Sequence, residues 1–403
     1  MRRLYGQRGL RAARRRERGC PLPAAAWLAS GKRPNVGSRA VPDLSVAVVG
    51  AGNVGCALAA DLSLRGFDVR LFNRSEGRLR DIRQAGGITA TGAVAGFASV
   101  GVVTTSLDEA VDGVDVVAVT LPTATFPNYA SQLVGATLEE QLIWLDPGHT
   151  GGALYLAAES ARLGAGPRKI AQLSTASHIS RITGPAEVRV FLLAQAAVAA
   201  LPAEHLDACC LLLERLLPGQ FTKAGSVLEV DLANINALMH PPGMVCNAGW
   251  IEASEGGFGF YRDGTRDAVS SVIEAVDRER LVLAESLGVP AVPFVELFAQ
   301  LGFTPNLPAP AATVAEAIVS SQLIHPIQSP PTLDHRYLHE DVAWGLVPWL
   351  HLARATRCET PTIDALTHLA GVMNGISYET EGLTLERMGL AGLSAAEIRL
   401  ATG

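Results

Sequence analysis

The sequence predicts an α/β fold, in which an N-terminal doubly wound parallel sheet is followed by a mostly α-helical C-terminal domain. Three observations predict it. A glycine-rich turn joins a strand-like run to a helix-like run near residue 50. Strand and helix patterns then alternate to about residue 200, as a doubly wound sheet requires. Beyond that point the apolar residues mostly follow helical spacing.

The composition fits two globular domains preceded by a tail. The 403 residues are 48% hydrophobic, which is ample for two cores. Residues 1–43 are rich in arginine and proline and low in serine, which favours a disordered basic tail or an upstream extension over a transit peptide. We expect the sheet domain at 44–202 and the helical domain at 203–403.

Charge and cysteine usage exclude several classes of partner. The net charge of −6 gives no support for a nucleic-acid or anionic-membrane partner. No apolar run is long enough to span a bilayer. The 6 cysteines show neither metal-like nor disulfide-framework spacing, so we expect a protein of the reducing cytoplasm.

A dinucleotide-binding turn is predicted at the first strand–helix junction. The run Val46–Val49 is apolar and mostly β-branched, like a buried parallel strand, and a G-x-G-x-x-G pattern follows it. In a Rossmann-type domain these glycines allow a tight turn, a close approach to the pyrophosphate and close helix–strand packing. The phosphates would bind at the positive end of the helix. The residues expected to hold the cofactor are Gly50, Gly52, Asn53, Val54 and Gly55. A glycine-rich turn without a ligand is the alternative.

The end of the second strand, Asp68–Phe72, indicates which cofactor binds. An acidic residue at this point would bind the ribose hydroxyl of NAD. Here Asn73 and Arg74 stand instead, and an arginine can pair with the 2′-phosphate of NADP. We therefore expect NADP(H) to be preferred, with NAD(H) possible. The alternative is that Arg74 is solvated and Glu76 contacts the ribose.

The other elements of the sheet domain follow in order. Helices are expected at 76–84 and 107–110, and strands at 100–105, 115–120 and 141–145. Because ligands bind beyond the C-terminal ends of parallel strands, the loops 120–126, with Pro122, and 146–152 should face the nicotinamide. Ordinary turn chemistry is the alternative for both loops. The runs 170–176 and 188–193 are candidates to extend the sheet.

The second half is predicted to be helical. An amphipathic helix is expected at 203–216, a short extended piece at 221–225, and a helix at 231–240 that Pro241 and Pro242 break. A long helix should run from about 269 to Gly288, and further helices cover 340–357 and 362–374. The proline-rich stretch 300–332 is expected to be irregular in parts.

Two groups of polar residues in this half suggest acid–base chemistry. Asn236 and His240 are four residues apart and project from one helix face. A histidine there can exchange protons near neutral pH, and the asparagine can bind a carboxylate or carbonyl. The second group is His335-Arg336-Tyr337-Leu-His339-Glu340-Asp341. It offers a guanidinium suited to a substrate carboxylate and a carboxylate able to orient a histidine.

The chain resembles the octopine/nopaline (opine) dehydrogenase family over about residues 45–395. The motifs that carry the resemblance are the glycine fingerprint, Pro-Gly-x-Thr-Gly-Gly at 147–152, Asn-x-x-x-His-Pro at 236–241, Tyr-Arg-Asp-Gly-Thr at 261–265, Asp-Arg-Glu-Arg at 277–280, His-Arg-Tyr-Leu-x-Glu-Asp-Val at 335–342, Gly-Leu-Val-Pro at 345–348 and Gly-Leu-Thr-Leu-Glu at 382–386.

The resemblance implies reductive joining of an amino acid to a 2-oxo acid by NAD(P)H. It implies a dyad of His240 and Asp341, in which His240 moves protons and Asp341 fixes its tautomer. It further implies that Arg336 holds a substrate carboxylate and that Asn236 orients substrate. His149 and Ala343-Trp344 depart from the family pattern, which leaves the substrate pair open.

Alternatives exist for each of these residues. His240 could be a core histidine, Arg336 could pair with Glu340, and His178 and Arg181 could line the cleft or be structural. A zinc site at His335, His339 and Glu340 is disfavoured, because no second ligand-rich segment is present, and we expect no metal.

Two other functions compete with the opine interpretation. An NADP-dependent reductase of a simple carbonyl, similar to ketopantoate or β-hydroxyacid reductases, would need a catalytic lysine, and neither Lys169 nor Lys223 is suitably placed. A non-catalytic NADP-binding sensor would leave the dyad without a task. We also expect a homodimer that acts on small molecules.

Overall fold

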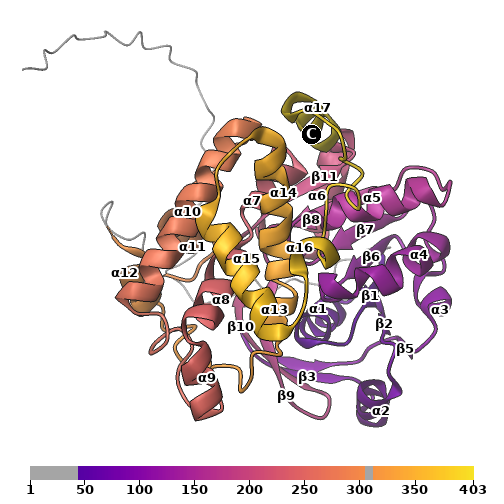
Figure 1. The fold of residues 1–403 in the computed structure, drawn as a ribbon. Coiled ribbons are helices and arrows are strands. Elements are labelled where there is room, and N and C mark those ends of the chain that lie inside the picture. The colour runs from indigo at the N-terminus through magenta and orange to yellow at the C-terminus, as the bar shows by residue number, and fades with distance from the viewer. Residues whose placement is uncertain (1–43, 305–311) are drawn as a thin grey trace, which may run out of the picture. The chain divides into compact units, whose positions relative to one another are not determined.

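The structure is a computed structural model that describes residues 44–304 and 312–403 (Figure 1). The expected tail at 1–43 and part of the proline-rich stretch, 305–311, lie outside the described residues. Within the described part of the chain, no helix has the length and apolar character needed to cross a membrane.

An 8-stranded sheet forms the N-terminal half (Figure 1). In spatial order its strands are β12 (Phe221–Lys223), β11 (Ala196–Leu201), β8 (Lys169–Leu173), β7 (Leu142–Leu145), β6 (Val116–Val119), β1 (Ser45–Val49), β2 (Asp68–Phe72) and β5 (Val102–Thr104). Neighbouring strands are parallel except β11 and β8. The chain order reverses at β1, between β2 and β6, which is the switch point where such sheets bind ligands.

Helices cover both faces of this sheet. They are α1 (Asn53–Leu64), α2 (Glu76–Ala85), α3 (Leu107–Val111), α4 (Phe126–Ala136), α5 (Gly152–Arg162) and α6 (Leu206–Leu216), with single 3-10 turns η1 (Thr123–Thr125) and η2 (Ala203–His205). Alternate residues of β1 enter two different cores, since Ala47 and Val49 pack on one face and Val46 and Val48 on the other. The predicted doubly wound fold is confirmed.

A second sheet of 4 strands packs beside α1 and was not predicted. Its order is β4 (Gly96–Ala98), β3 (Ile88–Gly92), β10 (Glu187–Leu193) and β9 (His178–Gly184). The run 188–193 therefore does not extend the large sheet, and that expectation was wrong. In β10, exposed Glu187 and Arg189 alternate with buried Val188 and Val190, as in a strand with one solvated face.

Helices make up the second half of the chain. They are α7 (Val227–Leu232), α8 (Ile235–Cys246), α9 (Ala248–Ser254), α10 (Asp267–Leu287), α11 (Phe294–Gln300), α12 (Val314–Ser320), α13 (Arg336–His339), the π-helix η3 (Val342–Leu346), α14 (Val347–Thr356), α15 (Pro361–Asn374), α16 (Tyr378–Glu381) and α17 (Ala395–Thr402). The long predicted helix is α10, and it ends at Gly288 with a positive φ of 67°. The large sheet takes β12 from beyond residue 202, where we expected the helical domain to begin.

The sequence predicted that the prolines at 241 and 242 end the helix that carries His240. This prediction was wrong. α8 begins at Ile235, capped by the Asn234 side chain, and continues through both prolines to Cys246. Each proline removes one helical N–H. Every residue from 237 to 245 is nevertheless buried, so tertiary packing outweighs the local preference of proline.

Candidate active site

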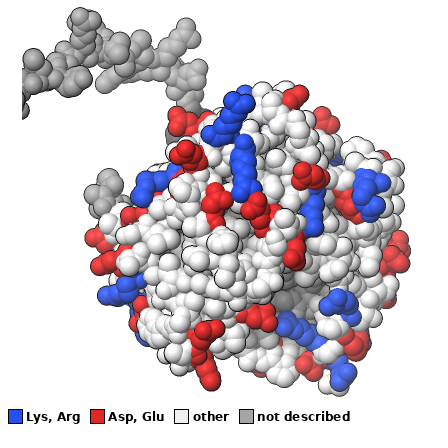
Figure 2. All heavy atoms as spheres, in the orientation of Figure 1, with Lys and Arg blue, Asp and Glu red and all other residues white. Residues whose placement is uncertain are grey.

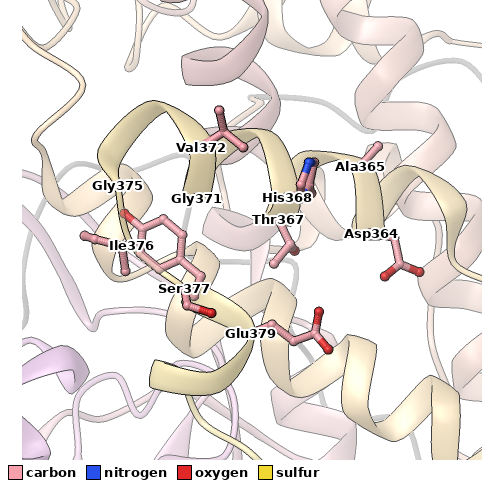
Figure 3. Close-up of a pocket in the computed structure, with 11 residues that line it drawn as sticks. Asp364, Ala365, Thr367, His368, Gly371, Val372, Gly375, Ile376, Ser377 and Glu379 are labelled. Carbon is pink, nitrogen blue, oxygen red and sulfur yellow. The ribbon is translucent and has the colours of Figure 1, made fainter.

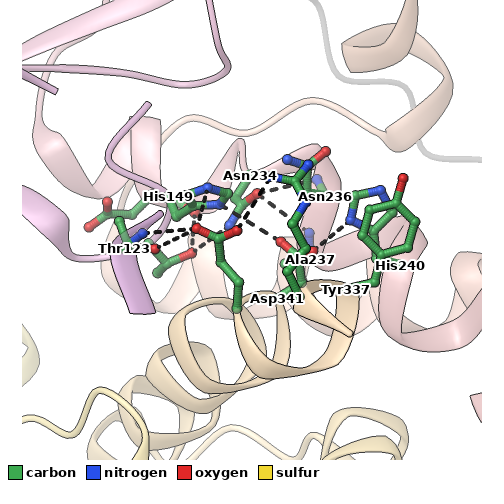
Figure 4. Close-up of polar contacts among 12 residues, drawn as sticks. Thr123, His149, Asn234, Asn236, Ala237, His240, Tyr337 and Asp341 are labelled. Carbon is green, nitrogen blue, oxygen red and sulfur yellow. Dashed lines mark hydrogen bonds and ion pairs between the residues drawn. The ribbon is translucent and has the colours of Figure 1, made fainter. Parts of the chain in front are cut away.

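His240 and Asp341 lie in direct contact, although they are 101 residues apart in the sequence (Figure 4). His240 is on α8, and Asp341 immediately precedes η3. The Nδ1–H group of His240 donates to Oδ2 of Asp341 at 2.6 Å, and the two side chains are only 5% and 3% exposed. Burial lowers the pKa of His240 despite the neighbouring carboxylate. His240 is therefore a neutral, oriented imidazole near neutral pH.

Two tyrosines surround the imidazole of His240. The hydroxyl of Tyr261 donates to Nε2 at 2.8 Å, and the ring of Tyr337 stacks on the imidazole at a centroid distance of 3.6 Å. Burial raises the pKa of Tyr261 well above its usual value, so its hydroxyl stays protonated. Sequence reasoning named these tyrosines only as members of motifs. Their role as neighbours of His240 follows from the fold alone.

A second histidine, His149, approaches Asp341 from the loop after β7. Its Nδ1 is 3.8 Å from Oδ1 of Asp341, and its Nε2 is 3.2 Å from Oε1 of Glu340. Glu340 also accepts hydrogen bonds from the backbone N–H and the hydroxyl of Thr123, at 2.9 and 3.3 Å. The loops after β6 and β7 thus both contact the segment that carries Asp341 (Figure 4).

The loop 146–152 is held in place by Asp231 of α7. Oδ1 of Asp231 accepts hydrogen bonds from the N–H of Gly151 at 2.8 Å and from the Gln172 amide at 2.6 Å. The hydroxyl of Thr150 donates to the Asp231 carbonyl. These contacts position His149, whose own backbone has a positive φ of 50°.

Arg336 and Asn236 lie beside the contact between His240 and Asp341 but do not take part in it. The Arg336 side chain is 52% exposed, with Nη1 3.9 Å from Oε2 of Glu340 and the guanidinium 5.8 Å from the Tyr337 ring centre. The pairing with Glu340 that the sequence left open is therefore present, at long range. The backbone N–H of Asn236 donates to Asn234, whereas its half-buried side-chain amide has no hydrogen-bond partner among the described residues.

The glycine turn has the geometry that a dinucleotide requires. A side chain on Gly55 would meet the Gly50 carbonyl at 1.7 Å, so helix and strand touch there, whereas a side chain on Gly52 would meet nothing within 4 Å. Open space at Gly52, beside the free N–H groups at the start of α1, fits a pyrophosphate. Asn53 accepts a hydrogen bond from Ile182 of β9, Val54 is half-buried, and Pro122 is exposed before η1.

Around the expected adenosine end, Arg74 forms no ion pair with an acidic residue in the described part of the chain, and Asn73 lies against the glycine turn. Asn73 accepts the Ala51 N–H at 3.3 Å, and Arg74 is exposed, 5.9 Å from the Tyr129 ring centre. Glu76 instead pairs with Arg83. A further arginine that sequence reasoning missed, Arg78, donates to the Ala51 carbonyl at 3.0 Å.

Other polar residues singled out in the sequence have structural partners. His178 is fully buried between Ser177 and Asp61, at 2.7 and 3.2 Å, and Ser177 in turn binds Asp146. His335 accepts the Tyr337 N–H, and His339 bonds to Asp334 and Tyr378. Among the described residues, no group of three or more His, Cys, Asp or Glu side chains is arranged to hold a metal ion.

A cavity of about 650 Å³ lies elsewhere, on the surface between α15 and α16 (Figure 3). Its lining includes Asp364, His368, Ser377 and Glu379 and no member of the contact between His240 and Asp341. Asp364 and Glu379 are paired with Arg354. This open groove is therefore separate from the buried contact between His240 and Asp341.

Comparison with known proteins agrees with this architecture. Residues 45–204 match the family described as NAD-dependent glycerol-3-phosphate dehydrogenase N-terminus, and residues 223–374 match the family described as NAD/NADP octopine/nopaline dehydrogenase, alpha-helical domain. An opine dehydrogenase of Arthrobacter sp. (strain 1C) is 35% identical over 360 residues, which are 88% of this chain and 98% of that protein.

The chain belongs to the opine dehydrogenase family. The resemblance predicted from its motifs is confirmed, and the protein is an NAD(P)-dependent oxidoreductase. Among solved opine dehydrogenases, octopine dehydrogenase with NADH and L-arginine superposes with a TM-score of 0.70 at 18% identity, covering 88% of this chain and 97% of that one. Yersinopine dehydrogenase bound to NADP+ has a TM-score of 0.68 at 17% identity, covering 89% and 97%. At these identities the two structures support the fold.

Proposed function

We propose that this opine dehydrogenase reductively condenses the amino group of an amino acid with a 2-oxo acid, with His240 as the acid–base catalyst and Asp341 as its partner. The observation that carries the proposal is the 2.6 Å hydrogen bond between Nδ1 of His240 and Oδ2 of Asp341. Nε2, which accepts the Tyr261 hydroxyl in this structure, is then the nitrogen that would exchange protons with substrate, and that hydroxyl would have to turn away or relay the proton. Octopine dehydrogenase, a structural relative, has been solved with L-arginine and with pyruvate, an amino acid and a 2-oxo acid.

The chemistry follows from the protonation state of His240. A neutral imidazole accepts a proton from the incoming ammonium at Nε2, which frees the amine to attack the oxo carbon. The imidazolium, stabilised by Asp341, then returns a proton as the carbinolamine loses water. Bound NAD(P)H supplies the hydride that reduces the imine carbon. Arg336, with its exposed guanidinium, would hold a substrate carboxylate, and the free amide of Asn236 would orient the substrate.

We test the reaction by following NADPH and NADH oxidation with a grid of 2-oxo acids, each with and without amino acids. Oxidation should require both partners. His240→Ala and Asp341→Asn should lower kcat by about 10²–10⁴-fold, the usual range for losing a general acid–base group or its orienting carboxylate. Unchanged NADPH binding, measured by fluorescence, would show that the variants fold. Oxidation with an oxo acid alone would favour a simple carbonyl reductase.

We further propose a preference for NADPH over NADH. Neutral Asn73 does not repel a 2′-phosphate, and Arg74 and Arg78 are exposed on that side of the glycine turn. Arg74→Ala should raise the KM for NADPH about tenfold, the effect of losing one charge-assisted contact, and leave that for NADH nearly unchanged. An equal rise in the KM for NADPH and for NADH would contradict the preference for NADPH.

The competing functions have less support. Lys169 and Lys223, the two lysines considered for a carbonyl reductase, lie on β8 and β12 and not on the helix that carries His240. A sensor without turnover gives no reason for a buried, oriented imidazole. We retain the cytoplasm as the expected location, consistent with 5 unpaired cysteines among the described residues.

A further inference from the structure

His149 and His240 approach the two different oxygens of the same carboxylate. His240 binds Oδ2 of Asp341, and Nδ1 of His149 lies 3.8 Å from Oδ1 (Figure 4). Oδ1 has no hydrogen-bond partner among the described residues, although it is buried. The His149 side chain is itself only 9% exposed. Asp341 therefore stands between two imidazoles.

The surroundings of Glu340 indicate that His149 carries a positive charge. Its carboxylate is 3% exposed and accepts two hydrogen bonds from Thr123, which favour the ionised form. A buried carboxylate requires a cation nearby, and His149 is the nearer one at 3.2 Å, while Arg336 is at 3.9 Å and half-exposed. The two carboxylates outweigh burial and raise the pKa of His149, and the pKa of Glu340 is lowered in turn.

The charged groups around His149 come from three elements. Glu340, Asp341 and Arg336 belong to the segment from α13 to η3, and His240 belongs to α8. On the side of α7, Asp231 binds Gly151, two residues along the loop, and the Gln172 amide of β8 donates to the His149 carbonyl. Two carboxylates thus lie against the imidazole, and the Arg336 guanidinium, which is near Glu340, opposes its protonation.

We propose that His149 is a positioning residue whose positive charge, held between Glu340 and Asp341, keeps His240 unprotonated near neutral pH. Without this cation, only burial and Arg336 would oppose the effect of Asp341, and the imidazolium form of His240, which cannot accept the ammonium proton, would be favoured more. The charge of His149 also disappears as the pH rises, so the basicity of His240 depends on a second titrating group. The effect of His149 on the protonation of His240 does not depend on the proposed function. Only its consequence for catalysis rests on that function.

The test is to titrate His240 directly by NMR in protein labelled with ¹⁵N-histidine, without substrates. The 9 histidines make the spectrum tractable, and His240→Gln assigns the resonance. His149→Gln should raise the pKa of His240 by about one unit, as expected for removing a charge at this range. His149→Arg, which keeps a cation, should leave it near the wild-type value. His339→Gln is the matched control, since His339 bonds to Asp334 and Tyr378 instead.

A kinetic experiment tests the same effect, by measuring the fall of kcat/KM on the acid side of its pH profile (the acid limb). This limb should move upward in His149→Gln by the same amount as the NMR titration, and it should be restored in His149→Arg. A merely structural role would lower activity at every pH without moving the limb. An unchanged His240 titration in a folded His149→Gln protein would overturn the proposal. A shifted titration without condensation of any substrate pair would leave it standing and refute the proposed function instead.

Discussion

Asp231 is a buried carboxyl group with hydrogen bonds on one oxygen and no ion-pair partner among the described residues. Burial raises its pKa to about 7, and the N–H groups of Gly151 and Gln172 only partly oppose this. Because the folded-state pKa lies above the unfolded one, this group stabilises the fold fully below about pH 4, and that contribution is lost as the pH rises through about 7.

The Asp231→Asn variant should therefore become more stable relative to the wild type as the pH rises. Both hydrogen bonds of Asp231 end on Oδ1, which the asparagine carbonyl can replace. The free energy of unfolding of the variant should gain on the wild type by roughly 1.4 kcal/mol per pH unit between about pH 4 and 7. Thermal unfolding at pH 5 and pH 7.5 measures this, with the exposed Asp108→Asn as a control. A constant difference would show that Asp231 is ionised throughout.

Tyr261 should influence the titration of His240 from the opposite side to Asp341. Its hydroxyl donates to Nε2 and so favours the unprotonated imidazole. Tyr261→Phe removes one hydrogen bond, worth about 1 kcal/mol, and should shift the acid limb of kcat/KM upward by less than about one unit. Activity should fall more at pH 6 than at pH 8. An equal loss at both values would indicate that the hydroxyl contacts substrate and does not tune His240.

The elements that carry His240 and Asp341 meet where glycine allows them to. A side chain on Gly345 of η3 would lie 2.8 Å from Cβ of Ala237 on α8. Gly345→Ala should force the two helices apart, destabilise the protein by about 1–3 kcal/mol and lower kcat, because the bond between His240 and Asp341 spans the same contact.

Gly135→Ala is the matched control for this change. Gly135 lies in α4, where an added side chain meets nothing within 4 Å. Its replacement should stabilise the helix by about 0.5–1 kcal/mol and leave kcat unchanged. Chemical denaturation and steady-state kinetics on both variants distinguish the two effects. Equal stability in the two variants would contradict the close contact between η3 and α8.

The helices and strands that could be predicted from the sequence are those that neighbouring residues along the chain determine. The glycine fingerprint and the apolar runs around it predicted β1, α1 and β2, because backbone approach and burial depend on neighbouring residues. The small sheet was missed because β3 and β4 are short and half-exposed, with few apolar residues to indicate them. The continuation of α8 was missed because burial, which outweighs Pro241, depends on distant packing.

The site was predictable only in part, for the same reason. His240, Asp341, Arg336 and Asn236 were found through motifs, but their contacts join residues far apart in the chain. The bonds from Thr123 to Glu340 span 217 residues, and the bond from Tyr261 to His240 depends on how the turn between α9 and α10 packs against α8. His149 was noted as unusual, and nothing in its neighbourhood along the chain indicated the carboxylates that it contacts.

At the scale of the whole molecule, we expect the second copy in the predicted homodimer to pack on α15. Its Leu369, Val372 and Met373 are 42%, 66% and 39% exposed, and Figure 2 shows a largely uncharged area on the face where α15 lies in Figure 1. The expected homodimer should be seen by light scattering, and Val372→Glu should convert it to a monomer. Leu211→Glu, on the exposed side of α6 at 67% exposure, should not. A monomeric wild type would refute this assignment.

The burial of the contact between His240 and Asp341 also bears on the speed of turnover. With the two side chains only 5% and 3% exposed, a molecule the size of an amino acid reaches Nε2 only when the surrounding packing loosens and then recloses. Such motions displace solvent and slow down in a viscous medium, whereas bond making and breaking do not. Turnover thus includes a chemical step and an opening-and-closing motion, and added glycerol, which raises the viscosity, should slow only the motion.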